Sequence, residues 1–146
     1  SMQVVNATTT DELLQYCKDR AQTENFPVTF LGWREDIEMV LAAADFVLLT
    51  SDNEGTPLSL IQAGMVGIPV VATNVGSTNE IVVNGETGLL TDLSVSDLSN
   101  SVAKVATDSD LRAKMGSAGK QYTMARYGVA RLVKDHQDLY LKLLKS

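Results

Sequence analysis

The sequence predicts an α/β fold in which an open, mostly parallel sheet is flanked by helices. Short apolar runs alternate with longer amphipathic segments, and the links between them are only a few residues long. The run at residues 46–49 is continuously apolar, as strands are when helices cover both faces of a parallel sheet. The 146 residues, 45% of them hydrophobic, suit one domain with its own core.

The predicted elements begin with a strand stub at residues 4–5 and a helix entry at residues 8–12. An apolar stripe at helical spacing follows that entry. Residues 27–31 form the next predicted strand, which Gly32 ends, and residues 35–44 form the next helix. Strand and helix therefore already alternate within the first third of the chain.

After the apolar strand at 46–49, the pattern predicts a helix over residues 57–66. Thr56 is expected to cap its N-terminus, Pro57 suits its first turn, and Gly67 is expected to end it. This helix would begin only a few residues beyond the strand.

The next predicted strands are residues 68–72, where Pro69 lies near the entry and is tolerated, and residues 88–90. Between them, Ser77 and Glu80 fit a capping box at the start of a short helix. The remaining chain is predicted to be helical over residues 97–107, 109–118 and 129–144, with breaks near Gly116, Gly119 and Gly128.

Charge is unevenly distributed along the chain. Every Lys and Arg lies at or before Arg34 or from Lys104 onward, so residues 35–103 carry acids but no base. The net charge of −6 argues against nucleic acid or an anionic membrane surface as the main partner. A phosphate bound by the middle segment would be held by backbone amides and helix N-termini, with cations supplied from elsewhere.

The single cysteine, Cys17, cannot form an internal disulfide, so we expect a reducing compartment and a cytoplasmic location. No segment is long and apolar enough to span a bilayer, and no signal peptide is recognised. Ser1 before Met2 is interpreted as a tag remnant, which suggests a fragment of a longer protein.

Ligands of open parallel sheets lie beyond the carboxyl ends of the strands. The loops expected there are residues 32–36, 50–58 and 73–79, and the second is the best candidate. Gly55 allows a ligand to approach the backbone, while Glu54 would accept hydrogen bonds from hydroxyl groups but repel phosphate.

Free amides near Leu58 and Ser59 would lie at the positive end of the helix dipole. Together with Glu54, they suit a sugar attached to a phosphate. Gln62 is eight residues after Glu54 and could bind a second hydroxyl-bearing part of the same ligand.

Ordinary structural roles compete with each of these readings. Residues 52–57 are common turn and helix-start residues, Glu80 can serve as a cap, and Gln62 can simply be exposed. Trp33 can cover a core edge as well as stack on a base. No residues have metal-ligand spacing or a nucleophile–base arrangement, so we expect no metal and no cofactor.

Several motifs occur in a fixed order between residues 28 and 92. They are Phe30-Leu31-Gly32, Ala42-Ala43-Ala44-Asp45, Ser51-x-x-Glu54-Gly55-x-Pro57-Leu58-x-Leu60-Ile61-Gln62-Ala63, Gly67-Ile68-Pro69-Val70-Val71-Ala72-Thr73, Gly76, Glu80 and Asn84-Gly85-x-Thr87-Gly88. This ordered set resembles the C-terminal, nucleotide-sugar-binding domain of the retaining GT-B glycosyltransferases of family four. The resemblance continues through the helical tail and covers most of the chain.

The resemblance implies a catalytic position for Glu54, as the first acid of an E-x7-E motif that contacts the donor sugar. The second position of the motif, which usually binds the ribose, holds Gln62 instead of an acid. Trp33 and Arg34 become plausible contacts of the base. The implied donor-binding residues are Gly55, Thr56, Pro57, Leu58, Ser59, Gln62, Trp33, Arg34 and Glu80.

The resemblance further implies that residues 1–146 are one donor-binding domain of a longer enzyme. That enzyme would transfer a hexose-type sugar from a nucleoside diphosphate sugar. The family's domain normally begins with another strand and helix, whose Arg and Lys neutralise the diphosphate. Those residues and the N-terminal acceptor domain are absent here, so we expect the fragment alone to transfer little sugar. Any peripheral membrane contact would come through the missing domain.

Three alternatives stay open. A binding or regulatory module could keep this fold without turnover, and Gln62 in place of an acid is the reason to consider it. A GT-B phosphorylase would need a cofactor lysine, which residues 35–103 do not contain, and an epimerase would use the same fold for other chemistry. A phosphoacceptor domain would need acids after the first strand, where Asn6-Ala7 stands.

Overall fold

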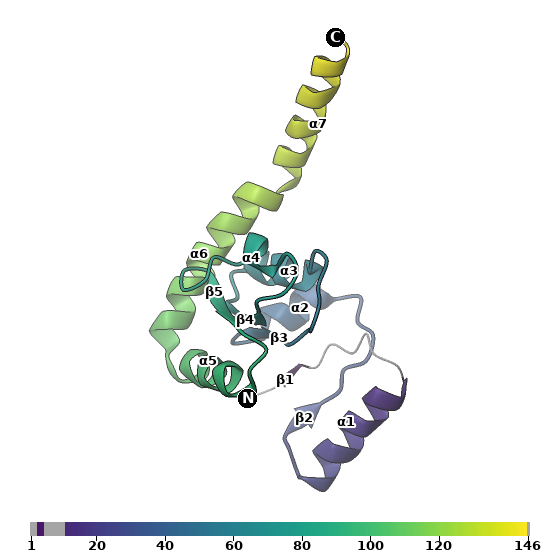
Figure 1. Cartoon of the computed structure of the whole chain (residues 1–146), viewed down its shortest axis with the longest axis vertical. Helices are drawn as coiled ribbons and strands as arrows, with labels where there is room; N and C mark the ends of the chain where they lie inside the picture. Colours follow the sequence, from purple (N-terminus) through teal and green to yellow (C-terminus); the bar gives the residue numbers. More distant parts are fainter. Residues whose placement is uncertain (1–2, 5–10, 146) are drawn as a thin grey trace. The chain divides into compact units, whose positions relative to one another are not determined.

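Parallel strands joined by helices account for most of the residues that the structure, a computed structural model, describes: 3–4 and 11–145 (Figure 1). Val5, most of the predicted helix entry at 8–12 and the interpretation of Ser1 fall outside the described residues. The chain divides into two compact units, Ser1–Met39 and Val40–Ser146, and each is described by itself.

In the first unit, β1 (Gln3–Val4) pairs in parallel with β2 (Val28–Thr29), and α1 (Asp11–Thr23) connects the two strands. The strand β2 is shorter than the predicted 27–31. The helix α2 (Ile37–Ala42) begins at the end of this unit and is also shorter than predicted.

The second unit contains a parallel sheet with the strand order β3-β4-β5. Its strands are β3 (Val47–Leu49), β4 (Val70–Thr73) and β5 (Gly88–Thr91). The central strand β4 is buried at all four positions, so helices cover both of its faces. The predicted open parallel sheet flanked by helices is confirmed.

Helices precede, connect or follow the strands of the second unit, and several of them pack on the sheet. They are α3 (Leu58–Val66), α4 (Thr78–Ile81), α5 (Val95–Thr107), α6 (Ser109–Tyr127) and α7 (Val129–Leu143). The helix α3 contacts β3 and β4, α5 contacts β4 and β5, and α6 contacts α3 and β5. The core formed in this way includes the fully buried side chains of Leu60, Val71, Val105 and Met115.

The start of α3 differs from the sequence-based prediction. Thr56 is not the N-cap, because the helix begins at Leu58 and Pro57 occupies the capping position without a side-chain hydrogen bond. Proline has no side-chain acceptor, so the first amides of α3 receive no cap from it. The predicted end is confirmed, since Gly67 adopts a left-handed φ of 83°.

The helix α6 was predicted to break near Gly116 and Gly119, and both predictions are wrong: it continues to Tyr127. A Cβ at Gly116 would overlap the carbonyl oxygen of Gly67. Gly116 therefore lets α6 lie close to the end of α3, which compensates for its weak helix propensity. The break predicted at Gly128 is confirmed.

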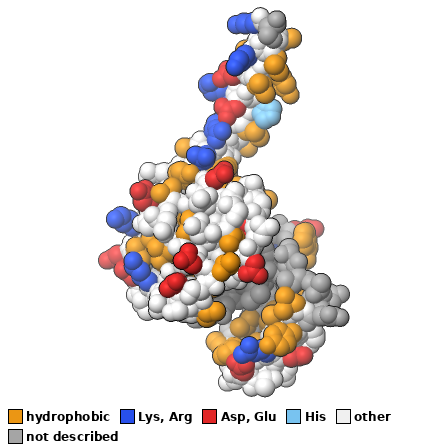
Figure 2. All heavy atoms as spheres, viewed as in Figure 1, with side chains coloured by type: hydrophobic (Ala, Val, Ile, Leu, Met, Phe, Trp, Pro, Cys, Tyr) orange, Lys and Arg blue, Asp and Glu red, His pale blue; other side chains and the backbone are white. Residues whose placement is uncertain are grey.

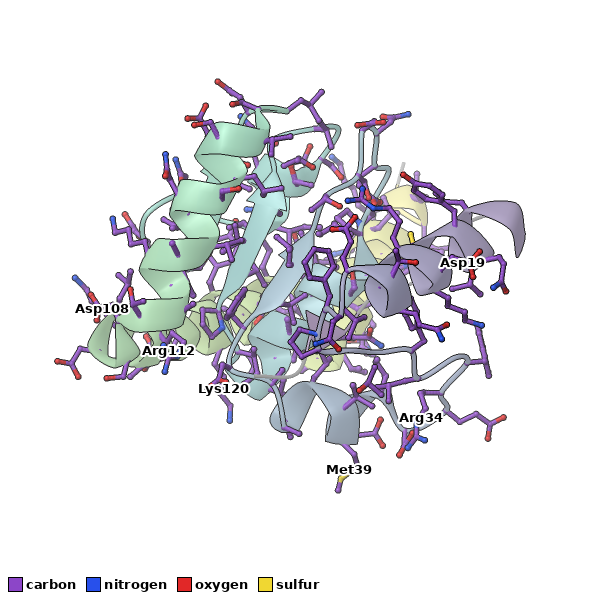
Figure 3. The ribbon with its side chains drawn as sticks, turned by 90° about the horizontal axis from the view of Figure 1, so that it is seen from below. Asp19, Arg34, Met39, Asp108, Arg112 and Lys120 are labelled. Carbon is purple, nitrogen blue, oxygen red and sulfur yellow. The ribbon has the colours of Figure 1, made fainter. Side chains whose placement is uncertain are left out.

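The turn between α5 and α6 is fixed by two side chains (Figure 3). The Asp108 carboxylate caps α6 by accepting a hydrogen bond from the Leu111 amide at 2.8 Å. The Arg112 guanidinium donates to the carbonyl oxygens of Val105 and Ala106, each at 2.8 Å. The two Arg112 contacts satisfy carbonyl groups at the end of α5 that lack helical partners.

Within the part of the chain that the structure describes, no residue of the helix α7 is buried. Figure 2 shows hydrophobic side chains along one side of α7 and charged side chains along another. Ion pairs at helical spacing lie on the charged side, Arg131 with Asp135 at 2.9 Å and Lys134 with Asp138 at 2.6 Å. Within residues 3–4 and 11–145, no helix is long and apolar enough to cross a membrane.

The two glycines of α6 provide a matched pair for testing how this helix packs. Gly116→Ala should destabilise the fold by about 1–3 kcal/mol, because its methyl group overlaps the Gly67 carbonyl oxygen. Gly119→Ala should be neutral or stabilising by up to about 1 kcal/mol, since the nearest described atom outside the backbone of its own helix is 3.6 Å from the added Cβ. Urea unfolding followed by circular dichroism measures both, and equal effects would contradict the packing described.

Candidate functional site

The loops that follow β3 and β4 contact each other at the carboxyl edge of the sheet. The Thr73 hydroxyl, at the end of β4, donates to the Ser51 carbonyl oxygen at 2.6 Å. A few residues further along both loops, the Ser77 hydroxyl donates to the Gly55 carbonyl oxygen. Because two hydrogen bonds tie the loops together, residues 51–55 are positioned by the neighbouring strand as well as by their own.

Gly76 allows the two loops to approach this closely. Its φ is +53°, in the left-handed region that favours glycine. A Cβ at this position would overlap the Glu54 carbonyl oxygen. The backbone of Gly76 therefore lies directly against the backbone of Glu54, and no other residue type fits there without moving a loop.

Thr78 organises the second loop from inside the core. Its side chain is 0% exposed, and its hydroxyl oxygen accepts a hydrogen bond from the Val75 amide at 3.0 Å. The hydroxyl proton can be donated to the carbonyl oxygen of Val75, at 2.8 Å, or of Thr73, at 3.1 Å. This buried threonine thus fixes the turn that carries Gly76 and Ser77.

The capping box predicted for Ser77 and Glu80 is wrong. Ser77 does occupy the N-cap position of α4, but its side chain makes no capping hydrogen bond. The hydroxyl is used instead by the Gly55 carbonyl oxygen in the neighbouring loop. A contact between loops far apart in the sequence has therefore replaced the local one.

Glu54 is half-buried, and its carboxylate is held by a neighbouring side chain. The Ser51 hydroxyl donates to Oε1 of Glu54 at 2.5 Å. Among the described residues, no hydrogen bond to Oε2 is found. Oε2 of Glu54 can therefore accept a hydrogen bond from a ligand.

The residues after Glu54 lead into the N-terminus of α3. Gly55 and Thr56 are exposed, Pro57 is buried, Leu58 is 62% exposed, and Ser59 is half-buried. The first turn of α3 has no side-chain cap and no acid. Its first amides therefore keep their donor capacity and the positive end of the helix dipole, both of which favour an anion.

Gln62 and Glu80 lie on the helices behind these two loops. Gln62 is half-buried in α3, and Glu80 is exposed on α4. The Glu80 carbonyl oxygen accepts hydrogen bonds from the hydroxyls of Tyr122 at 2.9 Å and Tyr127 at 3.0 Å. The last turns of α6 thereby hold α4 in place, while the Glu80 carboxylate remains exposed.

Trp33 and Arg34 belong to the other unit, so their proposed contact with the donor stays a prediction. Trp33 is 91% exposed and does not cover a core edge among the described residues. Arg34, which is labelled in Figure 3, makes a bidentate pair with Asp36, at 2.7 and 2.5 Å. The Arg34 guanidinium, through these hydrogen bonds, lowers the pKa of the Asp36 carboxyl.

Sequence reasoning missed the side chains that tie the loops together. Thr73 and Thr78 were not singled out, and Ser77 was given a local role. The available signal was a hydroxyl residue at the end of a strand, in Thr50-Ser51 and again in Thr73. Hydroxyl groups there can bridge to the next loop because parallel strands end at one edge.

Metal binding has no visible basis in the described ranges 3–4 and 11–145. No group of three or more His, Cys, Asp or Glu side chains is arranged there to hold a metal ion. The chemistry of the two loops is that of hydroxyl groups, amides and the carboxylates of Asp52 and Glu54.

Residues 10–122 match the family model described as "Glycosyl transferases group 1". The chain therefore belongs to this family, and its fold is that of a domain of the GT-B glycosyltransferases.

Two curated relatives illustrate the similarity. The chain is 26% identical over 120 residues to N-acetyl-alpha-D-glucosaminyl L-malate synthase from Bacillus anthracis, covering 82% of this chain and 32% of the relative. It is 30% identical over 115 residues to the Escherichia coli UDP-Gal:alpha-D-GlcNAc-diphosphoundecaprenol alpha-1,3-galactosyltransferase, covering 78% of this chain and 30% of the relative. The chain thus spans about a third of the length of these relatives.

A solved structure with a bound nucleotide is also similar. The crystal structure of Anabaena Alr3699/HepE in complex with UDP superposes with a TM-score of 0.79 at 29% sequence identity. The match covers 99% of this chain and 40% of that chain. The similarity therefore extends over nearly the whole chain.

The close approach of the two loops can be tested with two glycines that share a positive φ. Gly76→Ala and Gly85→Ala both place alanine at a positive φ, of 53° and 82° respectively, which costs about 1–2 kcal/mol. Only Gly76→Ala also overlaps the Glu54 carbonyl oxygen, so it should destabilise the fold by about 1–3 kcal/mol more. Thermal unfolding compares them, and a smaller loss for Gly76→Ala would refute the contact.

Proposed function

We propose that this chain is the donor-binding domain of a longer, retaining glycosyltransferase, which transfers a hexose-type sugar from a nucleoside diphosphate sugar to an acceptor. The observation that carries the proposal is that the N-terminus of α3, which has no side-chain cap, follows directly on a loop with the half-buried carboxylate of Glu54. The first feature suits an anion and the second suits hydroxyl groups, so a molecule that joins the two fits both.

The diphosphate would be bound by the amides of Leu58 and Ser59. No Lys or Arg lies within residues 35–103, so main-chain donors and the dipole of α3 are the local source of positive potential. A leaving diphosphate needs strong charge stabilisation during transfer. We propose that cations outside this chain complete it, and that the 146-residue chain alone transfers little sugar.

The sugar would lie against the loop that begins at Ser51. Glu54 would accept a hydroxyl hydrogen of the sugar, while the exposed backbone of Gly55 and Thr56 would allow the ring to approach. Gln62, one turn into α3, would bind the ribose hydroxyls with an amide instead of the family's carboxylate. Trp33 and Arg34 would contact the base, and no metal is needed for these contacts.

Support for a nucleotide donor comes from the similar proteins. Alr3699/HepE was solved in complex with UDP, and the Escherichia coli relative is named for UDP-Gal. The acceptor would be bound by the part of the enzyme that lies outside this chain, since the relatives are about three times longer. The chain's own role would be confined to the donor.

Gly55→Ala tests where the ligand lies. Among the described residues, no atom outside the chain neighbours of Gly55 is within 4 Å of a Cβ added there, and this glycine does not adopt a positive φ, so folding should be unaffected. A ligand against this backbone would be pushed away, which should weaken UDP-glucose or GDP-mannose binding by roughly tenfold or more. Isothermal calorimetry on the full-length protein measures the affinity, with Gly119→Ala as a control that should bind normally.

Glu54→Ala tests the reaction itself in the full-length protein. The loss of a charge-assisted hydrogen bond, about 1.5–3 kcal/mol, should weaken the nucleotide-sugar roughly 10- to 100-fold and leave the bare nucleotide unchanged. Transfer of labelled sugar should fall as well. Asp52→Ala, an exposed acid of the same loop, is the matched control. Donor binding with no transfer in the wild type would favour a non-catalytic module.

A further inference from the structure

The orientation of the Glu54 carboxylate is set by a chain of hydrogen bonds that starts in the core. Thr73 is only 3% exposed, and its hydroxyl donates to the Ser51 carbonyl oxygen at 2.6 Å. The Ser51 hydroxyl in turn donates to Oε1 of Glu54 at 2.5 Å. Glu54 is therefore connected to the end of β4 through a single intermediate residue.

This chain leaves the two carboxylate oxygens of Glu54 in different situations. Oε1 is engaged by Ser51, whereas no hydrogen bond to Oε2 is found in the part of the chain that the structure describes. A glutamate side chain has several rotatable bonds, and fixing them on ligand binding weakens the affinity. A carboxylate already held by Ser51 avoids much of that loss.

We propose that Ser51 is a positioning residue that holds Glu54 so that Oε2 faces the donor sugar. The inference rests on the proposed function, because it assigns Ser51 a role only through Glu54. Ser51 touches neither the sugar nor the diphosphate; its hydroxyl selects the rotamer of the carboxylate. Thr73 fixes the backbone of Ser51 and thereby the direction from which that hydroxyl donates.

The simpler alternative is that Ser51 only stabilises its own loop, as serine often does in turns. The geometry separates these two roles. The loop is anchored through the Ser51 carbonyl oxygen and by the Ser77 hydroxyl on Gly55, and neither bond involves the Ser51 side chain. Removing the Ser51 hydroxyl therefore deletes the bond to Glu54 and leaves these two anchors in place.

A double-mutant cycle in the full-length protein tests the coupling. The variants are Ser51→Ala, Glu54→Ala and the double substitution, and the probes are UDP with UDP-glucose and GDP with GDP-mannose. The pair that the wild-type protein binds is then measured in every variant. For each variant, the preference is the ratio of the dissociation constants of the nucleotide and its sugar conjugate.

Ser51→Ala should lower this preference roughly three- to tenfold, the equivalent of one hydrogen bond, without changing the affinity for the bare nucleotide. It should have no further effect when Glu54 is already alanine. Ser51→Thr, which keeps the hydroxyl, should restore the preference. Ser117→Ala, an exposed serine on α6, is the matched control and should behave like the wild type.

Three results overturn the inference, and they differ from one another. An equal loss from Ser51→Ala with and without Glu54 would show a role independent of the carboxylate. An unchanged preference in Ser51→Ala, with Glu54→Ala impaired, would leave the proposed function standing without the positioning role. If Glu54→Ala itself keeps the preference, the proposed function fails and the role of Ser51 falls with it.

Discussion

The contact between Gly76 and the backbone of Glu54 is the constraint on which the arrangement of the candidate site depends. Adjacent parallel strands bring their following loops to one edge, but they do not by themselves bring two backbones into contact. A glycine at a positive φ makes that approach feasible, and the hydroxyls of Thr73 and Ser77 then secure it. The position of residues 51–55 is consequently fixed as firmly as that of the strand ends.

The same constraint explains how a site for an anionic ligand can exist in an acidic segment. Lys and Arg are absent from residues 35–103, so electrostatic attraction comes from the main chain at the start of α3. Such donors are useful only if their direction is fixed. Pro57 restricts the backbone at the start of the helix, and packing of α3 on β3, β4 and α6 holds its axis.

The fold class could be predicted from the sequence because strand and helix periodicities alternate and the central strands are uniformly apolar. Helix ends were predicted where the residue type decides them, as at Gly67 and Gly128. Predictions failed where a distant segment decides the local structure. Gly116 lies within α6 at the point where this helix packs closely against the Gly67 carbonyl oxygen. The Ser77 hydroxyl donates to the Gly55 carbonyl oxygen instead of capping α4. Local patterns carry no information about such contacts.

Candidate ligand-binding residues were identified from the loop and from the resemblance, yet their supporting residues were not. Glu54 is conspicuous because a carboxylate beside glycine has an obvious chemistry, and Gly55 because it exposes the backbone. Thr73, by contrast, reads as an ordinary strand residue until the three-dimensional arrangement shows where its hydroxyl points. Residues that act through others are the ones that spacing along the chain does not reveal.

The Glu80 carbonyl oxygen, which accepts from both Tyr122 and Tyr127, has a consequence for tolerance to sequence change. A carbonyl oxygen has two lone pairs, so both are used here, and loss of either phenol still leaves the oxygen satisfied. The attachment of α4 to α6 is therefore redundant, in contrast to the single bond between Ser51 and Glu54. Evolution can alter one tyrosine without releasing α4, a freedom that the Glu54 carboxylate does not have.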